Sequence, residues 1–264
     1  MGRLVDRTKE ISYNNFGSKM EIVGCRRSTD IDVYFEEYNW IAKNRDYKEF
    51  VRKTLTCPYE RRTYGVGYLG EGKYKTTDNG KLSKFYNLWV NMLERCYDPY
   101  AINKHITYKD VFVEEYLLNF QNFAKWCEEN YYEIEGEEMH LDKDILCRAY
   151  GLNNKIYSRE TMIFVPQRIN KMFTKTDKLR GEYPIGVSYH KRDKVLRVKC
   201  GIYEDGKKEI RNLGSFPINK PFQAFTCYKN FKENYIKQVA DEYKDLIPTK
   251  LYNALYLYKV EIND

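Results

Sequence analysis

Apolar and polar residues alternate in two parts of this chain, and this alternation predicts strands. Near the N-terminus it covers residues 19–25 and 31–35, with a turn-like segment between them. Near the C-terminus it covers residues 185–190, 195–203 and 209–216. We therefore expect a small antiparallel sheet or barrel at the N-terminus and a three-stranded antiparallel sheet near the C-terminus.

Between and after these strands, apolar residues recur every three or four positions, as in amphipathic helices. The pattern predicts helices over 82–96 and 114–131, the second with the stripe Tyr116, Phe120, Phe123, Ala124, Cys127 and Tyr131. A long helix is expected after the last strand, with the stripe Ala224, Tyr228, Phe231, Tyr235, Val239 and Tyr243. The aromatic segment 248–264 is expected to dock on the body or to form a homo-oligomer contact.

Composition narrows the class of protein. The 264 residues suffice for two or three small modules, and a mean hydropathy of -0.73 without a long apolar run excludes a membrane helix. Seven cysteines without a Cys-x-x-Cys pair predict reduced thiols in a cytosol rather than disulfides or a zinc site. The net charge of +7 suits a nucleic-acid partner, or solubility alone.

A glycine-rich segment, residues 65–72, superficially suggests a loop that cradles phosphate. No Gly-Lys-Ser/Thr follows it, and no strand–turn–helix pattern surrounds it. We expect these glycines to make turns and close backbone contacts instead.

Candidate catalytic side chains gather between residues 139 and 170. His140, Asp142 and Asp144 surround the end of one apolar run, and Asn170 follows a second run, Ile-Phe-Val-Pro. This segment resembles the ββα-metal core of phage-type HNH (His-Me finger) nucleases. The resemblance implies that His140 is a general base, that Asp142 and Asp144 bind Mg²⁺ or Mn²⁺, and that Asn170 completes the catalytic set.

The chain also departs from that family. Lys143 places a positive charge where a metal site needs anionic or neutral ligands. Thr161 stands where the family carries its middle asparagine. An acidic run precedes the segment, namely Glu128, Glu129, Glu133, Glu135, Glu137 and Glu138, and carboxylates repel DNA phosphates. These departures favour a core that no longer cuts, and such a core needs no cofactor.

The C-terminal strands and helix resemble the Apetala-two-like DNA-binding domain, which reads the major groove with its three-stranded sheet. The resemblance rests on Gly186-Val-x-Tyr189, on Leu213-Gly-x-Phe216 and on the aromatic helix that follows. It implies that the exposed basic side chains of the sheet contact double-stranded DNA, and the candidates are Lys191, Arg192, Lys194, Arg197, Lys199 and Arg211. Alternation places Arg197 and Lys199 on one face, opposite Leu196 and Val198.

The expected fold class is α+β, in four segments: a β-rich N-terminal module (1–60), an HNH-like ββα core with flanking helices (61–175), a sheet-plus-helix module (184–247) and an aromatic tail (248–264). The resemblances imply a bacteriophage or prophage protein in the cytoplasm of a bacterial host. We expect it to act by binding, in counter-defence, on a host defence or DNA-processing protein or on DNA, without a membrane partner. The alternative is a metal-dependent homing-type endonuclease.

Overall fold

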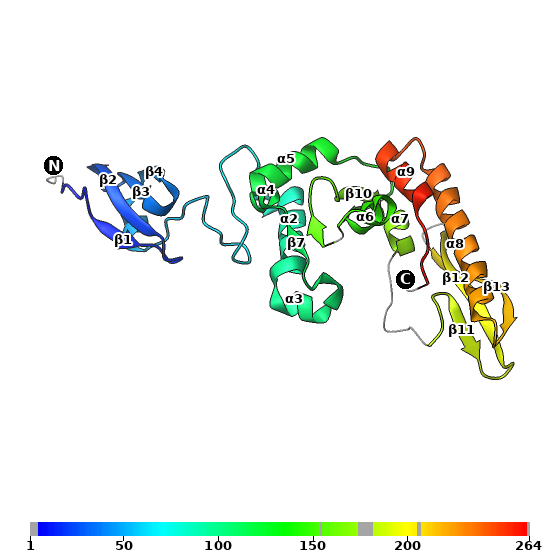
Figure 1. Ribbon diagram of the computed structural model, residues 1–264. Coiled ribbons are helices and arrows are strands. Elements are labelled where there is room, and N and C mark those ends of the chain that lie inside the picture. The colour runs from blue at the N-terminus through cyan, green and yellow to red at the C-terminus, as the bar shows by residue number, and fades with distance from the viewer. Residues whose placement is uncertain (1–4, 154, 174–181, 205–206, 263–264) are drawn as a thin grey trace. The chain divides into compact units, whose positions relative to one another are not determined.

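Figure 1 shows a computed structural model of the chain, which describes residues 5–153, 155–173, 182–204 and 207–262. The fold is mixed α+β, as the sequence predicts. The chain divides into two compact units. Met1–Lys109 and Val113–Cys127 form unit 1, whereas Asp110–Phe112 and Glu128–Asp264 form unit 2.

Unit 1 begins with a four-stranded antiparallel sheet in the order β1-β2-β3-β4. The strands are β1 (Ile11–Tyr13), β2 (Lys19–Arg27), β3 (Asp30–Phe35) and β4 (Trp40–Arg45), with the 3-10 helix η1 (Glu36–Tyr38) before β4. Alternate residues of β2 and β3 form the core, among them Met20, Ile22 and Val33. The predicted sheet is confirmed. Helix α1 (Tyr47–Val51) follows it, and the Asp46 side chain accepts a hydrogen bond at its start.

The rest of unit 1 is mainly helical. Its elements are β5 (Thr77–Asp78), β6 (Lys81–Leu82), α2 (Lys84–Tyr97), α3 (Pro99–Lys104), η2 (Ile106–Tyr108), β7 (Phe112–Val113, at the boundary), α4 (Glu115–Leu118) and α5 (Phe120–Asn130, which runs past the boundary). The helix predicted over 114–131 is interrupted. Asn119 is extended between α4 and α5, and its side-chain oxygen accepts a hydrogen bond from the main-chain N–H of Gln121. An asparagine that caps the following helix in this way ends the preceding one.

The glycine-rich segment of unit 1 packs closely against helices, as the sequence suggests. A Cβ atom at Gly67 would lie 2.4 Å from a methyl carbon of Leu93 and 2.8 Å from the ring of Trp89. Only a residue without a side chain fits against α2 at this point. Across the helices of the described residues, none is long and apolar enough to span a membrane.

Unit 2 holds both segments that carry the candidate residues. Its first part comprises β8 (Met139–Asp142), α6 (Asp144–Tyr150), β9 (Ile156–Tyr157), β10 (Ile163–Pro166) and α7 (Gln167–Phe173). Its second part comprises β11 (Val187–His190), β12 (Val195–Glu204), β13 (Lys207–Pro217), α8 (Pro221–Glu242) and α9 (Thr249–Leu257). Helix α8 lies along the three strands (Figure 1), and its stripe packs on them as expected: Ala224, Tyr228, Tyr235, Val239 and Tyr243 are buried, and Phe231 is partly buried.

One hydrophobic core joins the two parts of unit 2. It contains Ile145 of α6, Val165 of β10 and Ile169 of α7 together with Val198 of β12 and Leu251 of α9. Because this core is continuous, the compact unit does not divide at residues 175–184 or at 247, where the sequence suggested boundaries. Helix α9 packs on α6 and α8, so the aromatic tail docks on the body.

Candidate functional site

The segment expected to be a ββα core has two antiparallel strands followed by a helix. Strand β8 pairs with β10, so that His140 lies opposite Val165 and Asp142 opposite Ile163. Helix α7 follows β10 directly and packs against both strands. Helix α6 and the short strand β9 lie between the two strands in sequence. His140 and Asp142 are two residues apart on β8 and therefore share one side of the strand.

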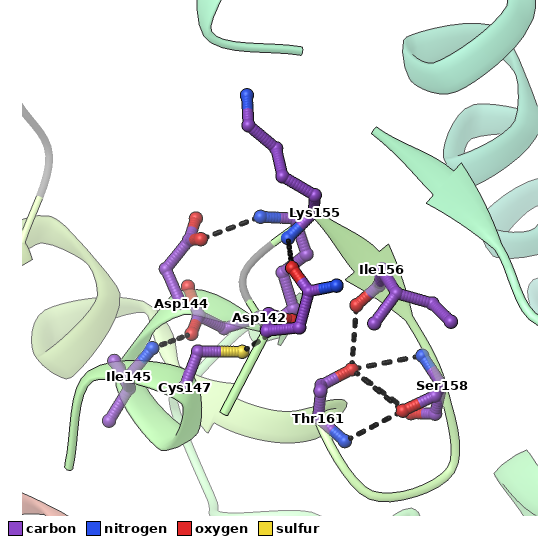
Figure 2. Close-up of polar contacts among 10 residues, drawn as sticks. Asp142, Asp144, Ile145, Cys147, Lys155, Ile156, Ser158 and Thr161 are labelled. Carbon is purple, nitrogen blue, oxygen red and sulfur yellow. Dashed lines mark hydrogen bonds and ion pairs between the residues drawn. The ribbon is translucent and has the colours of Figure 1, made fainter. Parts of the chain in front are cut away.

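Asp142 is engaged in holding helix α6. Its Oδ1 accepts a hydrogen bond of 2.9 Å from the main-chain N–H of Ile145, in the first turn of that helix (Figure 2). Burial raises the pKa of Asp142 to about 6. The carboxyl group is thus a helix cap in a poorly solvated place, which accounts for its position without a metal.

Lys143 and Asp144 form an ion pair beside it. The Lys143 side chain is only 6% exposed, and its ammonium group lies 2.6 Å from Oδ1 of Asp144, which is largely exposed. The same ammonium group lies 5.5 Å from the ring centre of Tyr157. The two neighbours of Asp142 in the proposed motif therefore neutralise each other.

His140 and Asn170 occupy β8 and α7. The Nε2 atom of His140 is buried and makes no hydrogen bond within the described residues. A carboxylate oxygen of Glu138 lies 3.9 Å from this nitrogen, which is beyond hydrogen-bonding distance. A general base must reach the proton that it removes, and this nitrogen is not accessible in the present conformation. Asn170 is partly buried on α7.

Thr161 closes the turn that precedes β10. Its hydroxyl donates to the carbonyl oxygen of Ile156 at 2.8 Å and accepts from the main-chain N–H of Ser158 at 2.9 Å (Figure 2). The residue is 3% exposed, so these contacts satisfy groups that water does not reach. Thr161 thus has a structural role at the position where the family carries asparagine. No group of three or more His, Cys, Asp or Glu residues with metal-ligand geometry occurs among the described residues.

The second candidate site is the face of the β11–β12–β13 sheet that α8 does not cover. Leu196, Val198, Cys200 and Ile202 are buried on the α8 side, so the alternate residues Arg197 and Lys199 lie on the other side, as predicted. Cross-strand partners share a side, and the register adds further residues to it. We call this surface the open face. Its central residues are Ser188, Arg197, Lys199, Gly201, Lys208, Ile210, Asn212 and Ser215.

A β-bulge decides which residues of β13 belong to the open face. Val198 pairs with Gly214, whereas Lys199 pairs with Asn212, so Leu213 is an extra residue in β13. Strict alternation from Ser215 would place Arg211 on the open face. The bulge reverses the phase, and Arg211 lies on the side of its partner Cys200. There it forms ion pairs with Glu204 at 3.2 Å and Glu209 at 3.7 Å. Arg211, one of the candidate DNA contacts, therefore does not share a side of the sheet with Arg197 and Lys199.

The remaining predicted basic residues lie in the β11–β12 turn. Lys191, Arg192 and Lys194 are exposed there, at one end of the sheet. Asp193 of the same turn forms an ion pair with Arg197, which fixes the direction of the arginine side chain. Lys199 is exposed, and its side chain forms no ion pair or hydrogen bond within the described residues. Sequence reasoning missed Lys208, Ile210 and Asn212, because their side depends on the bulge.

The sheet is also fixed to α7. Arg168 of α7 donates to the carbonyl oxygen of Tyr203 at 2.9 Å and forms an ion pair with Glu242 at 2.5 Å. The hydroxyl of Tyr235 accepts from the N–H of Tyr203 and donates to its carbonyl oxygen. These contacts fix Tyr203, near the end of β12, to α7 and α8 and make the sheet a preorganised surface.

Comparison of the chain with protein-family models, with curated proteins and with solved structures gives no match.

Proposed function

We propose that this protein acts by binding double-stranded DNA through the open face, without cutting it. The observation that carries the proposal is the composition of that face. Arg197, Lys199 and Lys208 stand on one side of a sheet whose other side is packed on α8. A cationic sheet face that is rigidly supported from behind is suited to contact the phosphates and base edges of a duplex.

Charge is concentrated in this part of the chain. Residues 184–220 contain nine lysines and arginines and four acidic residues, which gives +5 out of the net charge of +7 for the whole protein. A net charge of +5 on 37 residues produces a local field that the average over the chain conceals. This asymmetry favours the sheet as the contact surface over the other parts of the protein.

The non-catalytic part of the proposal rests on the engagement of the HNH-like residues. Asp142 caps α6, Asp144 neutralises Lys143, and Thr161 closes a turn. Each of these side chains makes a contact that stabilises the fold. It would have to give up that contact in order to bind a metal ion. The β8–β10–α7 arrangement then serves as a scaffold that supports the sheet through Arg168.

The test measures the affinity of the purified protein for a fluorescent duplex of about 24 base pairs over a range of salt concentrations. We expect affinity to fall steeply with salt. The double variant Arg197→Ala/Lys199→Ala should bind at least tenfold more weakly and show a salt slope smaller by about 2. Arg211→Ala is the matched control, because it removes one positive charge from the other side of the sheet. Equal losses in the two variants would contradict the proposal.

A second candidate is the metal-dependent endonuclease, favoured by the β8–β10–α7 arrangement and by the shared side of His140 and Asp142. Nicking of supercoiled plasmid with Mg²⁺ and with Mn²⁺ separates it from the first. Nicking that His140→Ala/Asp142→Ala abolishes would establish the nuclease. Intact plasmid with both metals, together with salt-dependent binding, supports the binding role.

The biological role in this proposal is counter-defence in the cytoplasm of a bacterial host, where the protein would block a host defence or DNA-processing complex. Support comes from the family resemblance. The test expresses the protein in hosts with and without a defence system and counts phage plaques. We expect rescue of plaques only in the defended host, and loss of rescue in Arg197→Ala/Lys199→Ala. If the variant rescues fully, the role does not depend on the open face.

A further inference from the structure

Strand β13 lies at the edge of the sheet and contributes two uncharged side chains to the open face. Ile210 and Asn212 are two residues apart on β13 and are both exposed, with Ile210 at 57%. Their partners across the sheet are Gly201 and Lys199. Both side chains reach the open face because of the bulge at Leu213, which removes Arg211 from it.

Cations border this pair of residues. Lys199 lies opposite Asn212, and Lys208 precedes Ile210 on the same side of β13. A Cβ atom at Gly201 would lie 3.0 Å from Cε of Lys208, so the stem of Lys208 crosses over this glycine. The apolar and amide side chains of β13 therefore have one lysine next to them along the strand, Lys208, and one across the strand pair, Lys199.

These residue types match base edges better than backbone. An isoleucine side chain has no favourable contact with a phosphate, but it packs on the C5-methyl group of thymine in the major groove. The side-chain amide of asparagine forms two hydrogen bonds with the adenine edge: its NH₂ group donates to N7, and its oxygen accepts from the N6 amino group. Within the described residues, no hydrogen bond is found for the Asn212 side chain, so its amide is available for a ligand.

The spacing along the strand also fits. A strand advances about 3.3 Å per residue, so Ile210 and Asn212 are about 6.6 Å apart. Base pairs in a duplex follow one another every 3.4 Å or so, which places two side chains of this spacing over base pairs two steps apart. A two-stranded ribbon of sheet fits the width of the major groove.

We propose that Ile210 and Asn212 determine sequence preference, reading A·T base pairs through the thymine methyl group and the adenine edge. This inference rests on the proposed DNA binding and adds which bases are preferred and which side chains select them. Arg197, Lys199 and Lys208 supply affinity that does not depend on sequence.

The experiment uses the full-length protein and three duplexes of equal length. One is A·T-rich, the second has the same sequence with every thymine replaced by deoxyuridine, and the third contains only G·C pairs. Deoxyuridine keeps the pairing and the charge of the duplex and removes only the C5-methyl group. We expect the wild type to bind the thymine duplex about fourfold more tightly than the deoxyuridine duplex, the effect of one buried methyl group.

Ile210→Ala should bind these two duplexes equally, whereas Ile218→Ala should keep the wild-type ratio. Ile218 is the matched control because it is similarly exposed, at 51%, and lies beyond the end of β13. Asn212→Ala should reduce the preference for the A·T-rich duplex over the G·C duplex at least fivefold. Thermal melting confirms that the variants are folded.

The outcomes separate this inference from the proposed function. Absence of binding to all three duplexes at low salt would overturn both. Tight, salt-dependent binding with equal affinity for the thymine and deoxyuridine duplexes would overturn the assignment of Ile210 alone. The assignment of Ile210 would also be overturned if Ile210→Ala kept the wild-type preference for the thymine duplex. The assignment of Asn212 would be overturned if Asn212→Ala kept the wild-type preference for the A·T-rich duplex.

Discussion

The ammonium group of Lys232 donates a hydrogen bond of 2.9 Å to the main-chain carbonyl oxygen of Met172. Lys232 lies on α8 with 7% of its surface exposed, and Met172 lies in the last turn of α7. Carbonyl groups at the end of a helix lack partners within the helix and carry its negative pole. This one contact therefore joins the β8–β10–α7 segment to the helix that supports the β11–β12–β13 sheet.

Lys232→Ala should lower the free energy of unfolding by about 2–4 kcal/mol. It removes a buried aliphatic stem and leaves the Met172 carbonyl without this donor. Urea denaturation measures the change. Lys237→Ala on the same helix is the control, and its less buried side chain should change stability by no more than about 0.5 kcal/mol. Similar values for the two variants would show that the buried contact contributes nothing.

The contribution of Lys232 should also depend on pH. Burial lowers the pKa of Lys232 below its usual 10.5. Between the lowered pKa and 10.5, the unfolded chain binds a proton that the folded chain does not, so stability rises with pH. The difference in unfolding free energy between wild type and Lys232→Ala should therefore increase as pH is raised toward 10.5. A difference that stays constant over this range would contradict the assigned cause.

The sheet next to this contact shows how far the sequence determines the fold. Alternation along β12 gave its strand and its buried side correctly, because Leu196 to Ile202 follow strict period two. Alternation does not hold through β13, since the extra residue Leu213 reverses the phase. The isolated Gly214 beside it, with a φ of 140°, is a local sign of a bulge, but it does not say which side chains change sides. Charge alone made Arg211 a candidate DNA contact, and no pattern in the sequence gives a reason to select Ile210 or Asn212.

The helices give a similar lesson. Apolar spacing continues through 114–131, so it predicts one helix, while the hydrogen bond from Gln121 N–H to the Asn119 side chain divides it. A lysine within a helix is usually exposed, so the burial of Lys232 could not be expected from its residue type. Its burial follows from tertiary contact between α7 and α8, which periodicity does not report.

Asp142→Asn tests whether Asp142 serves as a cap in a poorly solvated place. Burial raises the pKa of Asp142 to about 6, above its usual 3.8. Between these values the folded chain holds a proton that the unfolded chain has lost, so the contribution of Asp142 to stability is complete below pH 3.8 and is lost as pH rises through about 6. Asparagine keeps the cap without the charge. Relative to wild type, the variant should gain stability from pH 4 to pH 7.5 in urea denaturation. A constant difference would contradict the raised pKa.

Gly186→Ala should be strongly destabilising. Gly186 has a φ of 77°, and a Cβ atom there would lie 2.0 Å from a ring carbon of Tyr228 on α8. Gly151 provides the control, because it has a φ of 66° but no atom within 4 Å of an added Cβ. Alanine at Gly151 should cost about 1 kcal/mol for the backbone alone, and alanine at Gly186 at least about 2 kcal/mol more. Thermal or chemical unfolding of both variants measures the difference, and equal losses would refute the close packing.

Thr161→Val tests the structural role of Thr161 in the turn before β10. Valine has nearly the same shape, but it cannot accept from the N–H of Ser158 or donate to the carbonyl oxygen of Ile156. Both groups would then lose a partner at a site that water does not reach, and the free energy of unfolding should fall by about 2–3 kcal/mol.

Thr161→Ser separates this effect from packing. Serine keeps the hydroxyl and loses only a methyl group, so it should cost about 1 kcal/mol. The order wild type, serine variant, valine variant in decreasing stability is therefore the expected result of urea denaturation. If the valine variant proves as stable as the wild type, the hydrogen bonds of Thr161 do not stabilise the turn, and its structural role is refuted.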